Sequence, residues 1–284
     1  MHALIWLVPI TFLAATLNGI LGHGFSTLTV PMALAFLANR LLNPVLVLLE
    51  VVLNLGAFFS ARRDFPAIAP QVRPLALWLL PGVLVGSAVV ATLSAPSMKL
   101  LTFALLLPLV LLQAVGLRWE AKRNLTAPTG LTIGAIYAAT TISGPLLSLY
   151  FHNLRVARPT YRAGISFLRV VESLLTAGVY LALGLFTRQA LVLAAALLLP
   201  VLAGLALGAW LSWRIPEGAF AHGCVLFNTF AVAFGLTRLL QLRAPNPWLH
   251  LLWILPTTAV ALMRGLGLRR DLEALDLLPE ERAA

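Results

Sequence analysis

The sequence has few charged residues and little cysteine. Charged side chains make up 11% of its 284 residues, whereas a soluble globular domain carries about 25%. The one cysteine, Cys224, excludes an internal disulfide and a cysteine-based metal cluster. The sequence also lacks a Gly-x-x-x-x-Gly-Lys-[Ser/Thr] motif and any polar region large enough to hold a nucleotide, which disfavours an ATP-driven pump.

Long apolar segments dominate the chain instead. Hydrophobic residues make up 60% of it, and its mean hydropathy is +0.94. A helix needs about 20 apolar residues to cross a bilayer. The candidate crossings are residues 43–60, 74–93, 98–117, 163–185, 189–213, 218–240 and 247–264. The sequence therefore predicts an all-α protein that crosses a lipid bilayer several times. The net charge of +10 comes from basic residues that flank these segments, so it indicates membrane topology and no nucleic-acid partner.

Two further apolar regions, 3–37 and 127–154, are interrupted. Region 3–37 is too long for a single crossing, and region 127–154 has the same layout. The expected breakers are Gly19, Gly22, Gly24, Pro31, Gly130, Gly134 and the sequence TTISGP at 140–145. We expect each region to form a broken, re-entrant helix hairpin.

Each broken region is followed by three uninterrupted segments. The chain is therefore expected to contain two copies of one unit, residues 1–120 and 121–243, in the manner of many transporter folds. Residues 244–284 add a hydrophobic segment and an acidic tail, which we expect in the cytoplasm.

The distribution of Lys and Arg predicts how the two copies are oriented, because short cytoplasmic loops are enriched in these residues. If each broken region is a hairpin whose two ends lie on the same side of the membrane, thirteen basic residues lie on one face of the membrane and five on the other. The larger group is Arg62, Arg63, Arg73, Arg118, Lys122, Arg123, Arg155, Arg158, Arg162, Arg214, Arg264, Arg269 and Arg270. The smaller group is Arg40, Lys99, Arg188, Arg238 and Arg243. Equivalent loops of the two copies have opposite bias, which predicts an inverted repeat with the larger group in the cytoplasm.

Three ionisable residues lie in the middle of apolar segments. Glu50 lies in segment 43–60, and Arg169 and Glu172 lie in segment 163–185. A charged side chain at the bilayer centre costs about 2.5–3.5 kcal/mol on insertion scales, so such residues usually mark a site. The sequences LEVVLN around Glu50 and LRVVES around Arg169 also match, so a carboxylate in one copy takes the place of a guanidinium in the other.

The two breaks carry motifs of their own. Residues 22–31 read GHGFSTLTVP, and residues 142–146 read ISGPL. The first resembles the glycine-rich break followed by a proline in the TauE/SafE family of sulfite-exporter-like membrane transporters, and the second resembles that family's Gly-Pro turn. The resemblance covers about residues 1–240 and includes the duplicated layout. It implies secondary transport of sulfite or a small organosulfonate across a bacterial plasma membrane, by export or uptake, with export as the expected direction.

The breaks predict an anion site near the middle of the membrane. A helix that begins inside the bilayer exposes unpaired N–H groups, which attract anions, and a guanidinium offers forked donors. The expected substrate-binding residues are Gly22, His23, Gly24, Ser26, Thr27, Ser143, Gly144 and Arg169. In the alternative reading, the glycines only permit close helix packing and the hydroxyls bond to carbonyls of their own helices.

Glu50, Asn54 and Glu172 are the expected coupling or ion-pairing residues. Arg169 has two candidate ion-pair partners, Glu172 on its own helix and Glu50 across the interface between the copies. Burial favours the neutral form of a carboxylic acid, so Glu50 and Glu172 are also candidates to carry a proton. Asn54 lies one turn after Glu50 and is expected to hydrogen-bond it or to line the path.

Rival functions remain open at this point. An intramembrane hydrolase is disfavoured because Ser143-Gly144 lacks the glycine of a Gly-x-Ser-Gly site and the membrane segments contain no aspartate. A passive anion channel and a carrier of small carboxylates fit the same residues. His222, Cys224 and Asn228 have no metal-ligand spacing. We expect no cofactor, no metal site and no enzymatic activity, and a homodimer is left open.

Overall fold

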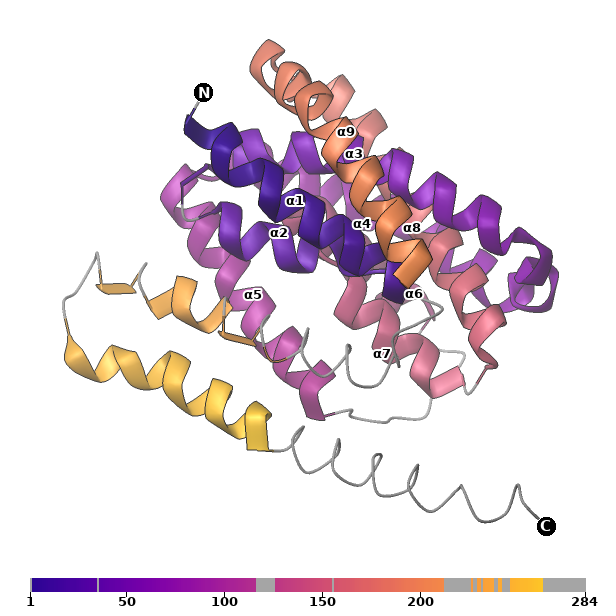
Figure 1. The fold of residues 1–284 in the computed structure, drawn as a ribbon. Coiled ribbons are helices and arrows are strands. Elements are labelled where there is room, and N and C mark those ends of the chain that lie inside the picture. Colours follow the sequence, from indigo (N-terminus) through magenta and orange to yellow (C-terminus); the bar gives the residue numbers. More distant parts are fainter. Residues whose placement is uncertain are drawn as a thin grey trace.

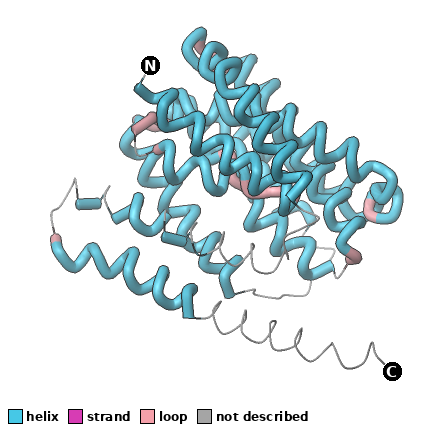
Figure 2. Tube along the Cα trace, viewed as in Figure 1, coloured by secondary structure: helices cyan, strands magenta, loops and turns pink. Residues whose placement is uncertain are grey.

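The computed structural model describes residues 2–34, 36–115, 126–154, 156–211 and 246–262, together with 226, 229–230, 232–237 and 240–241. These residues form helices joined by short loops and contain no strand (Figure 2). An all-α fold is therefore confirmed. Most of the predicted crossing 218–240, with His222, Cys224 and Asn228, and the tail beyond 262 lie outside the described residues.

The first half of the chain begins with two short helices. They are α1 (His2–Leu21) and α2 (Phe25–Ala33). Three longer helices follow, which are α3 (Asn39–Ala61), α4 (Ala69–Thr92) and α5 (Ala95–Val115), with the 3₁₀ turn η1 (Arg62–Ala67) between α3 and α4.

The described part of the second half repeats this order as far as the fourth helix. It begins with the short helices α6 (Thr126–Thr140) and α7 (Gly144–Leu154), followed by α8 (Arg158–Ala182) and α9 (Arg188–Leu211). The 3₁₀ turn η3 (Pro247–His250) continues into a helix that reaches residue 262.

Four helices of the described chain are long and apolar enough to cross a membrane. Their spans are Asn39–Ala67, Ala69–Thr92, Pro159–Ala182 and Arg188–Leu211, and shorter apolar helices occupy Leu4–Ile20, Ala95–Leu109 and Pro247–Leu262. This content agrees with a protein that passes through a membrane several times.

The centre of the bundle is the antiparallel pair α3 and α8. The start of α3 lies near the end of α8, since Val47 and Tyr180 share one cluster, and Asn54 of α3 contacts Ser173 of α8. α9 packs against α3, and α4 packs against α8. α3 thus contacts α8 and α9 of the second half, and α8 contacts α3 and α4 of the first half.

The first short helix of each half packs against a long helix of the other half. α1 lies along α9 (Figure 1), and α6 packs along α4. Both contacts depend on glycine: a Cβ on Gly19 would lie 2.6 Å from the Leu205 carbonyl oxygen, and a Cβ on Gly130 would lie 2.6 Å from Trp78 Cβ. The prediction that these two glycines break their helices is therefore wrong, because they instead let two backbones approach. Gly134 also lies inside α6, and Pro31 lies inside α2.

The glycine contacts also give the directions of these helices. Gly204 faces Phe12 and Gly208 faces Thr16, so α1 runs parallel to α9, and the same kind of pairing makes α6 parallel to α4. α7 then returns, because the Tyr150 hydroxyl donates to the Gln71 carbonyl near the start of α4 at 3.4 Å. Both ends of the α6–α7 pair therefore lie on the side where α4 begins.

The α1–α2 pair has the opposite placement. α1 begins on the side where α9 begins, and α2 ends beside the start of α5, where Lys99 Nζ donates to the Leu34 carbonyl at 2.7 Å. The end of α8 packs on this same side, because Leu185 and Phe186 lie against the cluster of Val90 and Met98.

Candidate functional site

Residues 22–24 and 141–143 separate the short helices of each half. Gly22 has a φ of 78°, Gly24 a φ of 109° and Thr141 a φ of 60°, all in the left-handed region. Gly22 and Thr141 each follow the end of a helix, and Gly24 directly precedes α2. Thr141 is β-branched, and such a residue is strained in the left-handed region. Gly22 and Thr141 have the same sequence separation as Glu50 and Arg169, 119 residues. The two halves thus interrupt their helices at matching positions.

The helices that follow the breaks have free N-termini. The first backbone bond of α2 runs from Leu28 N–H to the Gly24 carbonyl, and that of α7 runs from Leu147 N–H to the Ser143 carbonyl. The N–H groups before them have no partner within the helix. Each break therefore presents the positive end of a short helix to the interior of the bundle.

The two breaks meet at Gly144. A Cβ at this position would lie 3.4 Å from Thr27 Oγ1, 3.7 Å from Arg169 Nη1 and 3.7 Å from His23 Cδ2. Ser143 and Thr27 are buried, and Gly22, His23 and Gly24 are half-buried. Residues from the first break, the second break and α8 thus come together around Gly144.

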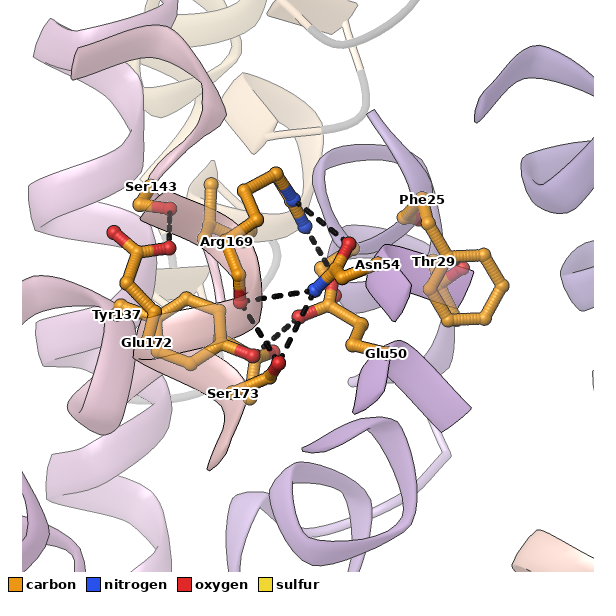
Figure 3. A network of polar contacts seen from close by, with 12 residues as sticks. Phe25, Thr29, Glu50, Asn54, Tyr137, Ser143, Arg169, Glu172 and Ser173 are labelled. Atoms are coloured by element: carbon orange, nitrogen blue, oxygen red, sulfur yellow. Dashed lines mark hydrogen bonds and ion pairs between the residues drawn. The ribbon is translucent and has the colours of Figure 1, made fainter. Parts of the chain in front are cut away.

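Arg169 and Glu50 form an ion pair across the α3–α8 interface. Nη2 of Arg169 lies 2.6 Å from Oε1 of Glu50, and the exposed fractions of the two side chains are 2% and 1%. The Ser26 hydroxyl donates to the same oxygen at 2.7 Å, and the Tyr137 hydroxyl donates to Oε2 at 2.6 Å. Figure 3 shows Arg169 and Tyr137 beside the Glu50 carboxylate. With Ser26 as the third donor, this carboxylate is fully paired although it is buried.

Asn54 holds Arg169 and not Glu50. Arg169 Nε donates to Asn54 Oδ1 at 3.2 Å, and Asn54 Nδ2 donates to the Arg169 carbonyl at 3.2 Å and to Ser173 Oγ at 3.4 Å. Of the two roles expected for Asn54, the hydrogen bond to Glu50 is therefore wrong, and the lining of the path stays a prediction. With Nε and Nη2 engaged, Nη1 is left as the donor group of Arg169 that no described residue occupies, and it is the nitrogen nearest to Gly144.

Glu172 lies on the other side of the site. The Ser143 hydroxyl donates to its Oε2 at 2.7 Å, while Oε1 is buried and has no hydrogen-bond partner among the described residues. Of the two predicted partners of Arg169, the structure contains Glu50, because the α3–α8 contact brings it to Nη2. With all three groups ionised, the cluster of Glu50, Arg169 and Glu172 carries one net negative charge.

A second polar group adjoins the first break. Ser148 Oγ lies 3.3 Å from His23 Nε2 and 3.2 Å from the Tyr161 hydroxyl, and Arg162 Nε lies 3.7 Å from the position of a Cβ on Gly22. Neither these contacts nor the role of Tyr137 was predicted from the sequence. Arg162 has one signal in the sequence, since it lies two helical turns before Arg169 on the same face.

The expected site residues therefore divide into two groups. His23, Thr27, Gly144 and Arg169 converge, with Gly22 and Gly24 in the break beside them. Ser26 and Ser143 lie nearby, but their hydroxyls donate to Glu50 and Glu172. Within the described part of the chain, no three His, Cys, Asp or Glu side chains are grouped closely enough to hold a metal ion.

Comparison with known families identifies the chain. The model of the Sulfite exporter TauE/SafE family matches residues 7–236, which include both breaks and Arg169. The chain belongs to the TauE/SafE family. Comparisons with curated proteins and with solved structures found no match.

Membership gives the broad activity. TauE/SafE proteins are membrane transporters and not enzymes, and the apolar helices α3, α4, α8 and α9 agree with a multi-pass membrane protein. The resemblance seen in the two break motifs is therefore confirmed at the level of the family. The converging polar groups lie where two helices begin inside such a bundle, which is a common place for a transporter to bind its solute.

Proposed function

We propose that this TauE/SafE protein is a secondary exporter of sulfite or a small organosulfonate in the plasma membrane of a bacterium. The anion binds where the two breaks meet, and it contacts Arg169, Thr27, His23 and the backbone around Gly144. Ser26 and Ser143 hold the two buried carboxylates in place. The chain works as two inverted repeats, residues 1–120 and 121–243, that alternate access to this site.

The observation that carries this proposal is the position of Arg169 Nη1. Two of the three guanidinium nitrogens are engaged by Glu50 and Asn54, which fixes the side chain. Nη1 faces Gly144 and Thr27 at the meeting point of the breaks. A hydrogen bond from a charged donor contributes roughly 1.5–3 kcal/mol, and a fixed donor loses little conformational entropy on binding. The oxygens of a sulfite or sulfonate group match such convergent donors.

Glu172 is the better of the two candidate proton carriers. Glu50 already accepts hydrogen bonds from Arg169, Ser26 and Tyr137, whereas Oε1 of Glu172 has no partner among the described residues. An anion added to a cluster with one net negative charge is repelled at short range. A proton taken up by Glu172 removes that repulsion, so we propose that the proton and the anion move together.

Three features of the fold support inverted repeats and alternating access. The short helix pairs enter the bundle from opposite sides, and each packs against a long helix of the other half. The breaks have matching positions in the two halves. The half-buried residues of the site, Gly22–Gly24, lie beside α7 and the start of α8. A rotation of one half against the other would make this site accessible from the opposite side.

The test uses purified protein in liposomes that contain a pH indicator. A thermal-shift screen with sulfite, sulfate, thiosulfate, sulfoacetate, taurine and lactate first identifies the ligand class. We expect sulfite or sulfoacetate to raise the melting temperature and to change the internal pH during flux. Lactate alone as ligand would indicate a carboxylate carrier, and flux of net charge without a pH change would indicate a passive channel. Either result would reject the proposal.

A further inference from the structure

A polar cluster on the half-buried side of the first break adjoins the Arg169 site and shares His23 with it. Its members are His23, Ser148, Tyr161 and Arg162, contributed by the break, α7 and α8. Ser148 connects His23 and Tyr161 by contacts of 3.3 Å and 3.2 Å. Arg162 lies beside the backbone of Gly22, with Nε 3.7 Å from the position of a Cβ there. The cluster therefore lines the same break as the central site, but from its outer side.

Arg162 is a cation without a counter-ion in the described part of the chain. No described residue forms an ion pair with its guanidinium or accepts a hydrogen bond from it. A half-buried cation without a counter-ion attracts a mobile anion. Incomplete burial leaves the guanidinium accessible from water, and the lower dielectric constant of the protein interior strengthens the attraction.

The face of α8 connects Arg162 with Arg169. Arg162, Ser166, Arg169 and Ser173 follow one another at spacings of three or four residues, so they share one face of the helix. Ser166 donates to the Arg162 carbonyl at 2.6 Å, and Ser173 donates to the Arg169 carbonyl at 2.7 Å. Both hydroxyls are thus used by their own helix, and the two guanidinium groups remain as the donors of this face. They are about 10 Å apart along the axis.

The cluster also has a defined place relative to the two ends of the bundle. Arg162 lies in the first turns of α8. Near this end, a Cβ on Gly164 would lie 2.5 Å from Phe151 of α7 and 3.1 Å from Ile68 next to α4. Exposed Arg62, Arg63 and Arg73 lie at the same end, in η1 and early in α4. An anion that moves between this basic end and Arg169 passes the cluster.

We propose that Arg162, with Ser148, Tyr161 and His23, forms a second anion-binding site that receives the solute between the basic end of the bundle and Arg169. This inference rests on the proposed function. The second site binds a small oxyanion, and the charge of that anion contributes more to binding than its shape. Arg162 contributes attraction, and Ser148 and Tyr161 contribute hydroxyl donors. The central site then selects the anion through the guanidinium of Arg169, which Glu50 and Asn54 hold in one orientation.

The experiment compares Arg162→Gln with Arg63→Gln, an exposed basic residue of the same end, in liposomes with sulfite supplied to that end. We expect Arg162→Gln to raise the half-saturating sulfite concentration about three- to tenfold, with a maximal rate within about twofold of the wild type. Arg162→Lys should recover most of the loss, because it keeps the charge. Arg63→Gln should behave like the wild type.

A second measurement varies only the charge at position 162, after the guanidinium has been replaced. Arg162→Cys is prepared in a Cys224→Ala background and treated with a positively or a negatively charged thiol reagent, with Ala157→Cys as the matched control. The positive reagent should restore low half-saturation at position 162, and the negative reagent should raise it further.

Equal kinetics for Arg162→Gln and Arg63→Gln, or equal effects of the two reagents, would overturn this inference while wild-type flux persists. Absence of sulfite or sulfonate flux in the wild type would instead reject the proposed function.

Discussion

Glu50 and Arg169 lie at matching positions of the two halves and pair with each other, with Nη2 and Oε1 2.6 Å apart in the interior of the bundle. The pair joins the two halves at the level of the breaks. Loss of one buried partner leaves the other charge unpaired, which costs about 3–5 kcal/mol. We expect Glu50→Gln and Arg169→Gln each to lower the melting temperature strongly.

The double variant Glu50→Gln/Arg169→Gln separates pairing from charge. It leaves two neutral amides that are able to hydrogen-bond, so its melting temperature should lie above that of either single variant. Thermal unfolding in detergent measures all four proteins. Additive losses in the double variant would show that the ion pair does not contribute to stability in this way.

Gly144→Ala tests the meeting point of the breaks. The added methyl group fits, since its nearest neighbours would be 3.4–3.7 Å away, but it occupies the volume in front of Thr27 Oγ1 and Arg169 Nη1. We expect normal melting of the unliganded protein and a loss of sulfite or sulfonate affinity of at least about tenfold. Gly178→Ala is the control, because a Cβ there meets no atom within 4 Å. Unchanged affinity in Gly144→Ala would place the anion elsewhere.

Glu172→Gln tests proton coupling. The amide keeps a hydrogen-bond acceptor for Ser143 but is unable to exchange a proton. We expect flux to become independent of the pH gradient, with retained anion binding, and internal pH to stay constant during the flux that remains. Glu50→Gln and Asn54→Ala are less suitable tests, because both disturb Arg169 directly. Normal proton movement in Glu172→Gln would exclude this residue as the carrier.

Thr141→Gly tests the strain in the second break. A β-branched residue at a φ of 60° is unfavourable, and glycine adopts this conformation freely. Thr141 also has a hydrogen bond from Oγ1 to the Thr140 carbonyl at 2.6 Å, which glycine loses. The strain outweighs this local bond, so we expect unfolding to require about 1 kcal/mol more in Thr141→Gly. Thr141→Val keeps the strain and loses the bond, and a melting temperature above that of Thr141→Gly would contradict the argument.

Cysteine labelling tests the topology of the broken regions. In a Cys224→Ala background, single cysteines replace Ala67, Ser94, Ala157 or Gln189, which are exposed. Re-entrant hairpins place Ala67 and Ala157 on one side of the membrane and Ser94 and Gln189 on the other. Broken regions that cross once would instead pair Ala67 with Gln189. A membrane-impermeant thiol reagent applied from one side distinguishes the two patterns.

The position of the breaks could be predicted from the sequence, but not the role of every glycine. Gly22 and Gly24 have backbone conformations that favour glycine, so the cluster of glycines in an apolar segment was sufficient to predict the position of the first break. Gly19 and Gly130 have the same appearance in sequence, yet they serve helix contacts whose partners are far along the chain. Sequence spacing alone does not distinguish these two uses of glycine.

The charged centre was also predictable, whereas its hydrogen bonds were not. Glu50, Arg169 and Glu172 stand out because charge is costly in an apolar segment. Tyr137 does not, since a tyrosine inside an apolar helix is usually a packing residue, and only the contact of α6 with α3 gives its hydroxyl a carboxylate. The partners of Asn54 and the engagement of Ser26 and Ser143 likewise depend on helix rotations that periodicity leaves undetermined.

The most direct test of the anion site is calorimetric titration of sulfite or sulfoacetate into the wild type and into Glu50→Gln/Arg169→Gln. The double variant removes the guanidinium without leaving Glu50 as an unpaired buried charge, so a folded protein remains for the measurement. We predict saturable binding by the wild type and an affinity at least about tenfold lower in the folded double variant, in which the Arg162 cluster is still present. Equal affinity of the two proteins would contradict the account.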